Sequence, residues 1–391
     1  MNIAIVLPCF KRVSALSELC QTLLNAYYDG DSVSLVFSID YSGTNDVVDF
    51  AKSFEWPYGL KRVIEHETNI GLRNNIISCG DLTNEYDAVI VIEDDLEVAP
   101  SFYRFAKGAA EFYGNDDRIG GVSIYQYYTE EISHTQFLPI YESYDAYFVQ
   151  WASSWGQLWT RKQWRSFKAW YEAHEDISSI PIPMKVRNWK RSWKKYYIAY
   201  LADTNRYFVF PFVSQIFNGN KAGGFHTVQS LVVSTSSPFD IVGTKEFRFP
   251  KFDDIQFKYD AYFQIIPRVI TVNGKEYKVE FDLYGHKEII QEDYVITSRK
   301  CNEADVIQSF DAGMIPLECN ILTGKQGSVF HLIPQKAFVP KNKVPLIPAV
   351  RIRKSISWKQ YLPLYFNRLF DAIKRHSNNN KWAFFHHIKK G

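Results

Sequence analysis

The first 125 residues alternate short apolar runs with segments of helical spacing, and this alternation is the strongest constraint on the fold. The apolar runs lie at residues 2–7, which Pro8 is predicted to end, and at 33–40, 62–66, 87–93 and 119–125. Helical spacing is found between them at residues 13–28, 71–81 and 101–113. Repeated strand–helix alternation predicts a mostly parallel, doubly wound α/β sheet, in which ligands bind at the carboxyl ends of the strands.

Three consecutive acids, Glu93, Asp94 and Asp95, follow the apolar residues 88–92. Such a continuous run suits a central strand that is covered on both faces. Neighbouring carboxylates repel one another, so they are tolerated when they are solvated or when a cation neutralises them. Mg²⁺ and Mn²⁺ prefer such oxygen ligands and usually complete their shell with phosphate oxygens and water. The alternative is a solvated turn that leads into the helix after Pro100.

Three other features follow predicted strands on the same side of the sheet. Arg12, beside Lys11 in "LPCFKR", could contact a diphosphate, and Asp40, at the end of "LVFSID", could accept hydrogen bonds from a base or ribose. The third is "NIGLRNNI", a helix start that contains Arg73 and whose free N–H groups favour an anion. Each feature alone is weak, but their common edge predicts a phosphate-binding site.

Composition and charge exclude several other classes of protein. Residues 341–391 contain 12 Lys+Arg and 1 Asp, whereas residues 1–340 contain 33 Lys+Arg and 42 Asp+Glu, a net charge of −9. No segment of this acidic body resembles a nucleic-acid-binding motif. No apolar run is long enough to span a bilayer, which favours a cytoplasmic location. The five cysteines lack metal-ligand spacing and are predicted to be buried thiols: Cys9, Cys20, Cys79, Cys301 and Cys319.

The rest of the chain is aromatic-rich and then β-rich. A helix is predicted at residues 161–174, with Trp159 and Trp164 in the core and Trp155 in contact with a sugar. Asn273 and Gly274 predict a type I′ turn between two strands. The predicted domains are 1–230, a nucleotide-binding catalytic domain, 231–340, a β-rich accessory region, and 341–391, a basic tail.

The segment "VIVIEDDLEVAPSFYRF", residues 89–105, resembles the metal-binding segment of N-acetylglucosaminyltransferase I and of related bacterial, family 2-like GT-A glycosyltransferases. Further segments follow in the order of that family: "LPCFKR", "FSIDYSG", "ETNIGLRNNI", "SWGQLWTRKQW" and "NGNKAGGFHT". The resemblance covers about residues 1–228, and the EDD segment is its most specific part.

The resemblance implies a GT-A, Rossmann-like fold and a metal-dependent transferase that uses a nucleoside diphosphate sugar, with a UDP-sugar favoured. Asp95 would bind Mn²⁺ or Mg²⁺, Asp94 a ribose or a metal-bound water, and Glu93 the donor sugar. The residues implied in donor binding are Pro8, Arg12, Asp40, Asn69, Arg73, Glu93, Asp94, Trp155 and His226. The acceptor would be a glycan or a lipid-linked sugar, as in surface polysaccharide synthesis, with inversion at the anomeric centre.

The match fails at the catalytic base, because inverting relatives place an acid beside a Trp where this chain has "NWKRSWKKYY". Asp203 is the favoured replacement, and the other acids considered are Glu172, Glu175 and Asp176. The basic residues of this segment, Lys190, Arg191, Lys194 and Lys195, either recognise an anionic acceptor or form a solvated helix face with Trp189 and Trp193 turned to the core. The remaining alternatives are a nucleotide-sugar-binding module with little turnover and a sugar-phosphate nucleotidyltransferase. The latter usually needs an N-terminal glycine-rich loop that "LPCFKR" lacks.

The basic tail contains a predicted amphipathic helix. One face carries Leu362, Phe366, Leu369, Phe370 and Ile373. This pattern suits either a helix on an anionic membrane surface, which would make the protein peripheral on the inner face of the membrane, or a helix docked on the acidic body.

Overall fold

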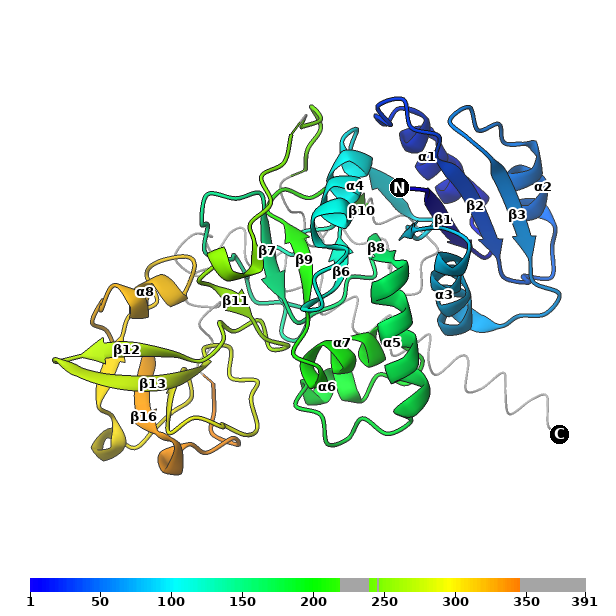
Figure 1. The fold of residues 1–391 in the computed structure, drawn as a ribbon. Helices are drawn as coiled ribbons and strands as arrows, with labels where there is room; N and C mark the ends of the chain where they lie inside the picture. The colour runs from blue at the N-terminus through cyan, green and yellow to red at the C-terminus, as the bar shows by residue number, and fades with distance from the viewer. Residues whose placement is uncertain (219–238, 245, 345–391) are drawn as a thin grey trace, which may run out of the picture. The chain divides into compact units, whose positions relative to one another are not determined.

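The computed structural model describes residues 1–218, 239–244 and 246–344 (Figure 1). By its internal contacts the chain divides into two units, residues 1–343 and residues 344–391. Every element below belongs to the first unit. The predicted amphipathic helix of the tail and His226 lie outside the described residues.

The main sheet confirms the mostly parallel α/β architecture. Within the described residues it has nine strands in the order β11-β7-β9-β6-β8-β4-β1-β2-β3. Strands β3, β2, β1, β4, β6 and β9 run in one direction, and β8, β7 and β11 run in the other. The strands are β1 Ile3–Cys9, β2 Ser34–Ile39, β3 Lys61–Glu65, β4 Ala88–Val91, β6 Ile119–Ser123, β7 Ala146–Val149, β8 Gln157–Thr160, β9 Tyr207–Pro211 and β11 Lys258–Tyr259.

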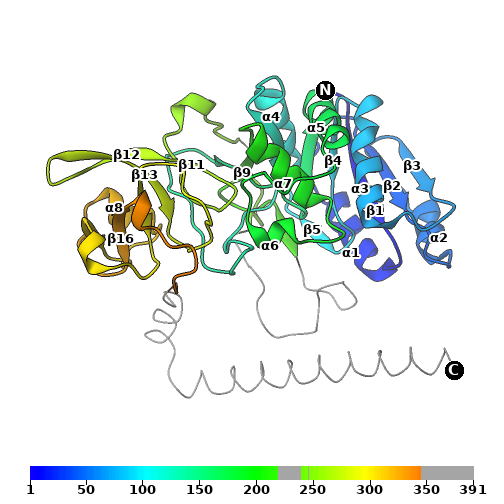
Figure 2. The same cartoon turned by 90° about the horizontal axis from the view of Figure 1, so that it is seen from below.

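Helices cover both faces of this sheet, which explains why its central strands are apolar throughout (Figures 1 and 2). Helix α4 packs against β6 and β8 on one face, and α5, which contacts α7, packs against the same strands on the other. The helices are α1 Val13–Leu24, α2 Asp46–Ser53, α3 Gly71–Asp81, α4 Phe102–Tyr113, α5 Arg161–Ala173, α6 Met184–Arg187, α7 Lys194–Asp203 and α8 Glu318–Leu322, with short 3-10 turns η1 Leu82–Asn84, η2 Phe252–Asp254, η3 Glu303–Asp305 and η4 Gln335–Ala337.

The aromatic residues between 159 and 200 form the core under α5 and α7. Thr160 and Gln163 form a capping box that starts α5 directly at the end of β8. The Trp159 and Trp164 rings are buried with their centroids 4.7 Å apart, and Trp159 stacks on Tyr197 of α7. The prediction that Trp159 and Trp164 belong to the core is therefore confirmed.

A second sheet of five strands lies in the predicted β-rich region, in the order β12-β13-β14-β16-β15. Asn273 and Gly274 connect its first hairpin with φ values of 51° and 76°. Positive φ at both positions is the requirement of a type I′ turn, so this prediction is confirmed. The strands are β12 Arg268–Val272, β13 Lys275–Asp282, β14 Tyr294–Thr297, β15 Gln308–Phe310 and β16 Phe330–Pro334; a separate two-stranded sheet pairs β5 Leu96–Val98 with β10 Ile216–Asn218.

Buried charges connect the two larger sheets. Lys287 Nζ lies 2.6 Å from Asp260 Oδ2, directly after β11, and 2.8 Å from Glu280 Oε1 in β13. Arg299 donates from Nε to Asp282 Oδ2 at 3.0 Å. Because a buried ion left without its partner is costly, Lys287 holds the second sheet to the chain after β11, and the Arg299–Asp282 pair acts within the second sheet. No helix of the described chain combines the length and apolar character that a membrane crossing requires.

Glu318, the first residue of α8, is expected to make folding stability depend on pH. Its side chain is buried, and neither carboxylate oxygen has a hydrogen-bond partner in the part of the chain that the structure describes. Burial raises the pKa of Glu318 from 4.5 to about 7. Between these values the folded chain holds a proton that the unfolded chain has lost, so the free energy of unfolding falls as pH rises through the window. The loss should be on the order of 3 kcal/mol by about pH 8.

Urea unfolding at about pH 5 and pH 8 measures this loss. Glu318→Gln cannot ionise and should lose distinctly less stability than the wild type over the same interval. The exposed Glu303→Gln serves as the control and should behave as the wild type. Equal pH dependence in the wild type and Glu318→Gln would contradict the prediction.

Candidate functional site

Pro8 shapes the edge of the sheet at which the three acids lie. Strand β1 does not end at Pro8 as predicted but continues to Cys9, because it still pairs there with β2. On its other side, the N–H of Ile92 donates to the carbonyl of Val6 at 3.0 Å. The next bond of this parallel ladder would need an N–H on residue 8, which proline lacks. The chain after β4 is therefore free to leave β1 at Ile92, immediately before the acids.

Arg12 bridges two of the three acids in the gap between these strands. It directly precedes α1, and its Nη1 lies 2.8 Å from Asp95 Oδ2. Its Nη2 forms a second ion pair with Asp94 Oδ1. The side chains are only partly accessible: 22% for Arg12, 6% for Asp94 and 14% for Asp95. The alternative of an acidic turn exposed to solvent does not fit this burial.

The acids remain electrostatically strained despite Arg12. Burial, followed by repulsion from Asp95 and Asp94, raises the pKa of Glu93 to about 8. Burial also raises the pKa of Asp94 to about 6, against the opposing effect of Arg12. Oδ1 of Asp95 is buried without any hydrogen-bond partner among the described residues. The site therefore has more negative charge and more acceptor atoms than the neighbouring cation satisfies.

This donor set fits a small divalent cation such as Mg²⁺ or Mn²⁺. Asp94 and Asp95 supply carboxylate oxygens, the ligand type that these ions prefer, and Asp95 Oδ1 is already free of a partner. In the described ranges no group of three or more His, Cys, Asp or Glu side chains is arranged to hold a metal. An ion here would need oxygens from a ligand or from water to complete its shell.

The carboxylate of Asp40 pairs with the free backbone N–H groups at the start of α3. The two carboxylate oxygens of Asp40 accept hydrogen bonds from the N–H groups of Ile70, at 2.8 Å, and Gly71, at 2.9 Å. The anion at this helix start is thus the carboxylate of Asp40. A role of Asp40 with a nucleotide base remains a prediction.

Asn69 and Arg73 lie on either side of this helix start. Asn69 donates to the carbonyl of Tyr41 at 3.1 Å. Arg73 donates to the carbonyl of Lys190 at 2.8 Å and lies over the ring of Tyr196. Arg73 therefore connects α3 to the segment before α7.

Trp155 lies in the loop before β8, at the end of β8 that is near the acids. Gln157, the first residue of β8, pairs with Val91, the last residue of β4, so the preceding loop lies at the edge where the acids emerge. The Trp155 ring is partly exposed and packs edge-on against Tyr125, with centroids 4.8 Å apart. This position leaves part of the ring available for the predicted sugar contact.

Gln157 itself is a site residue that the sequence analysis missed. It is fully buried between the ends of β4 and β6, and both atoms of its amide lack hydrogen-bond partners within the described chain. Cross-strand partners project from the same face of a sheet, so Gln157 projects on the same side as Val91. A buried Gln in the apolar segment "GQLW" is a signal that could have found it.

Lys194 contradicts the prediction of a fully solvated basic helix face. It is 5% exposed, forms an ion pair with Glu131 and donates to the Tyr127 hydroxyl at 3.2 Å. Its ammonium also lies over the rings of Trp151 and Trp189. Only Lys190 and Arg191 of the basic group are exposed, while Trp193 is buried as expected.

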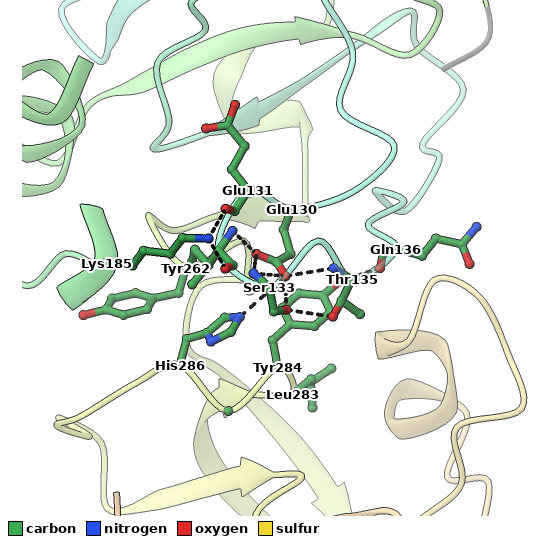
Figure 3. A network of polar contacts seen from close by, with 12 residues as sticks. Glu130, Glu131, Ser133, Thr135, Gln136, Lys185, Tyr262, Leu283, Tyr284 and His286 are labelled. Carbon is green, nitrogen blue, oxygen red and sulfur yellow. Dashed lines mark hydrogen bonds and ion pairs between the residues drawn. The ribbon is translucent and has the colours of Figure 1, made fainter. Parts of the chain in front are cut away.

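A separate network fixes the loop that carries Glu131 (Figure 3). The buried Glu130 accepts hydrogen bonds from the backbone of Ser133 and Thr135, and His286 Nε2 lies 3.6 Å from its Oε1. Lys185 donates to the carbonyl of Ile132 at 2.7 Å. No sequence motif indicates this loop, and the Glu131–Lys194 contact spans 63 positions.

The structure does not bring Asp203 to the three acids, which argues against the prediction that it is the base. Asp203 ends α7 and precedes the amino-terminal end of β9, which runs parallel to β6 and β4. The acids follow the opposite, carboxyl-terminal end of β4. Its carboxylate instead accepts a hydrogen bond from Trp170 Nε1 at 2.7 Å. The alternative acids, Glu172, Glu175 and Asp176, are exposed at the end of α5.

The Lys194–Glu131 pair is expected to stabilise the fold asymmetrically. Glu131→Gln leaves a nearly inaccessible ammonium without its counter-ion and should cost about 3 kcal/mol. Lys194→Met leaves the more accessible carboxylate and should cost less. The double variant should recover part of the loss, because neither charge remains. Urea unfolding of the four proteins measures the coupling, and strictly additive losses would contradict it.

Comparisons with known proteins give distant structural similarities. No protein-family model and no curated protein matches the chain. A structure of S. aureus TarS, residues 1–349, is similar over 56% of this chain and 61% of its own, with 13% identity and a TM-score of 0.37. The same fragment in complex with UDP is similar over 54% of this chain and 60% of its own, with 13% identity and a TM-score of 0.34.

A third structure is the mannosyltransferase PcManGT from Pyrobaculum calidifontis in complex with GDP-Man and Mn²⁺. It is similar over 41% of this chain and 45% of its own, with 12% identity and a TM-score of 0.29. The chain therefore spans less than two thirds of each of these structures, and TM-scores in this range do not establish a shared fold.

Proposed function

We propose that the protein is a metal-dependent glycosyltransferase that moves a sugar from a nucleoside diphosphate sugar to a glycan or a lipid-linked acceptor. A UDP-sugar is the favoured donor, Mn²⁺ or Mg²⁺ the cofactor, and inversion the proposed outcome. The predicted contact of the basic tail with an anionic membrane surface is part of the same proposal.

One observation carries this proposal: Asp94 and Asp95 meet Arg12 at the carboxyl edge of β4, with a buried carboxylate oxygen left over. Ligands of mostly parallel α/β sheets bind at this edge. A diphosphate needs positive charge, and a pair of acids can supply it only through a bound cation. The adjoining guanidinium adds a direct phosphate partner with fork geometry.

The bound ion would neutralise the nucleoside diphosphate as it leaves the sugar. Asp95 is the proposed metal ligand, Asp94 the contact to ribose or metal-bound water, and Glu93 the contact to the donor sugar. Arg12 binds the diphosphate, and Trp155 stacks on a sugar ring. Pro8, Asp40, Asn69, Arg73 and His226 complete the proposed donor site.

The catalytic base separates two candidate functions. The position of Asp203 disfavours it, and Glu131, which lies where α7 begins, is engaged by Lys194. This engagement favours a second candidate function, a nucleotide-sugar-binding protein with little turnover. Both functions share the donor site and differ in whether the sugar is transferred.

Donor binding is tested with purified protein and a panel of nucleoside diphosphate sugars, with and without Mn²⁺. A donor at about 100 times its dissociation constant should stabilise the fold by about 2.7 kcal/mol, which thermal unfolding detects as a shift of a few degrees. Asp95→Asn should abolish the part of this shift that requires Mn²⁺, because it removes the proposed ligand charge. Slow hydrolysis of the donor is followed in parallel.

The exposed Asp254→Asn is the matched control and should retain the metal-dependent shift. A shift without hydrolysis or transfer would support the binding protein over the transferase. A panel without any metal-dependent shift would contradict both functions.

A further inference from the structure

Arg12 and a metal ion would compete for the same two carboxylates. Arg12 holds Asp94 Oδ1 and Asp95 Oδ2, so one oxygen on each acid is already engaged. A cation on the free Oδ1 of Asp95, with Asp94 holding one of its waters, would lie within a few ångströms of the guanidinium. Two positive charges at that distance in a half-buried site repel strongly, so the bound cation and the Arg12 bridge oppose each other.

No other cation in the described ranges forms an ion pair with these acids. Lys11 is exposed over the ring of Phe10, and Arg73 is held by α7 and its preceding segment. Lys194 forms its ion pair with Glu131. Within the described ranges, Arg12 is therefore the ion-pair partner that Asp94 and Asp95 share.

The side chain of Arg12 can leave without a change in the backbone. Its carbonyl accepts a hydrogen bond from Leu16 N at 3.0 Å, which fixes the start of α1. The guanidinium forms no hydrogen bond in the described chain except those to Asp94 and Asp95. A rotamer change of one side chain is therefore sufficient to release both acids.

We propose that Arg12 is an exchangeable counter-ion, which neutralises Asp94 and Asp95 in the empty site and transfers to the donor diphosphate when the divalent cation takes its place. This inference rests on the proposed function and adds to it a coupling between the binding of the cation and the binding of the diphosphate. The cation alone binds weakly, because it must break two ion pairs and leave the guanidinium unpaired. A diphosphate offers the guanidinium a new partner, so cation and diphosphate bind with positive coupling.

The test measures the affinity for Mn²⁺ by electron paramagnetic resonance, with and without UDP or GDP. It does not depend on a measurement of enzyme activity. In the wild type, at least one nucleotide should raise Mn²⁺ affinity by about tenfold or more. Arg12→Met should bind Mn²⁺ alone about tenfold more tightly than the wild type, with a smaller further gain from that nucleotide. Circular dichroism of each variant confirms that the fold is retained.

Two variants separate the bridge from the general effect of charge. Lys11→Met removes an adjacent positive charge that forms no ion pair with the acids, and should bind Mn²⁺ as the wild type does. Arg12→Lys keeps the charge but loses the two-pronged bridge, and should bind Mn²⁺ alone about threefold more tightly. Unchanged affinity in Arg12→Lys, or an equal gain in Lys11→Met and Arg12→Met, would overturn the exchange.

A double variant distinguishes the failure of the proposed metal site from the failure of the exchange alone. If Asp95→Asn, introduced into Arg12→Met, did not weaken Mn²⁺ binding, the metal site and the exchange would both be wrong. If that double variant lost Mn²⁺ but Arg12→Met bound Mn²⁺ no more tightly than the wild type, the metal site would stand and only the exchange would fall.

Discussion

Three consecutive carboxylates at the end of a buried strand are the constraint on which the site depends. Water alone cannot neutralise them, because Asp94 and Asp95 are largely shielded from it. Pro8 ends the ladder to β4, and Arg12, four positions later, returns to bridge the two acids in the space that results. The residue that ends the ladder to β4 and the counter-ion of the acids thus lie within five residues, from Pro8 to Arg12.

The same principle operates at the neighbouring strand. Asp40 directly follows β2 and accepts hydrogen bonds from the N–H groups at the start of α3, where the sequence predicted an external anion. Oppositely charged groups that could bind a ligand can also pair with each other, and a buried charge without a partner is costly. Both acidic positions are therefore paired within the chain, and a ligand at this edge would have to exchange with these partners.

The sequence predicted what local patterns determine. Alternating runs predicted the parallel sheet, Asn273-Gly274 the hairpin turn, and the tryptophan spacing the core under α5. It failed where a distant partner decides the environment. Lys194 resembles a solvated residue in its own segment, and Glu131, brought close by another loop, supplies the counter-ion for its burial.

That pair also changes where a catalytic base should be sought. The resemblance seen in the sequence implied an acid beside Trp193, whereas this chain has Lys194 there and an acid on the facing loop. The loop is held rigidly, because Glu130 bonds its backbone and Lys185 its carbonyls. A loop held by such hydrogen bonds can position a carboxylate. Glu131 is nevertheless engaged by Lys194, so a role as the base of the proposed transferase would first require this ion pair to open.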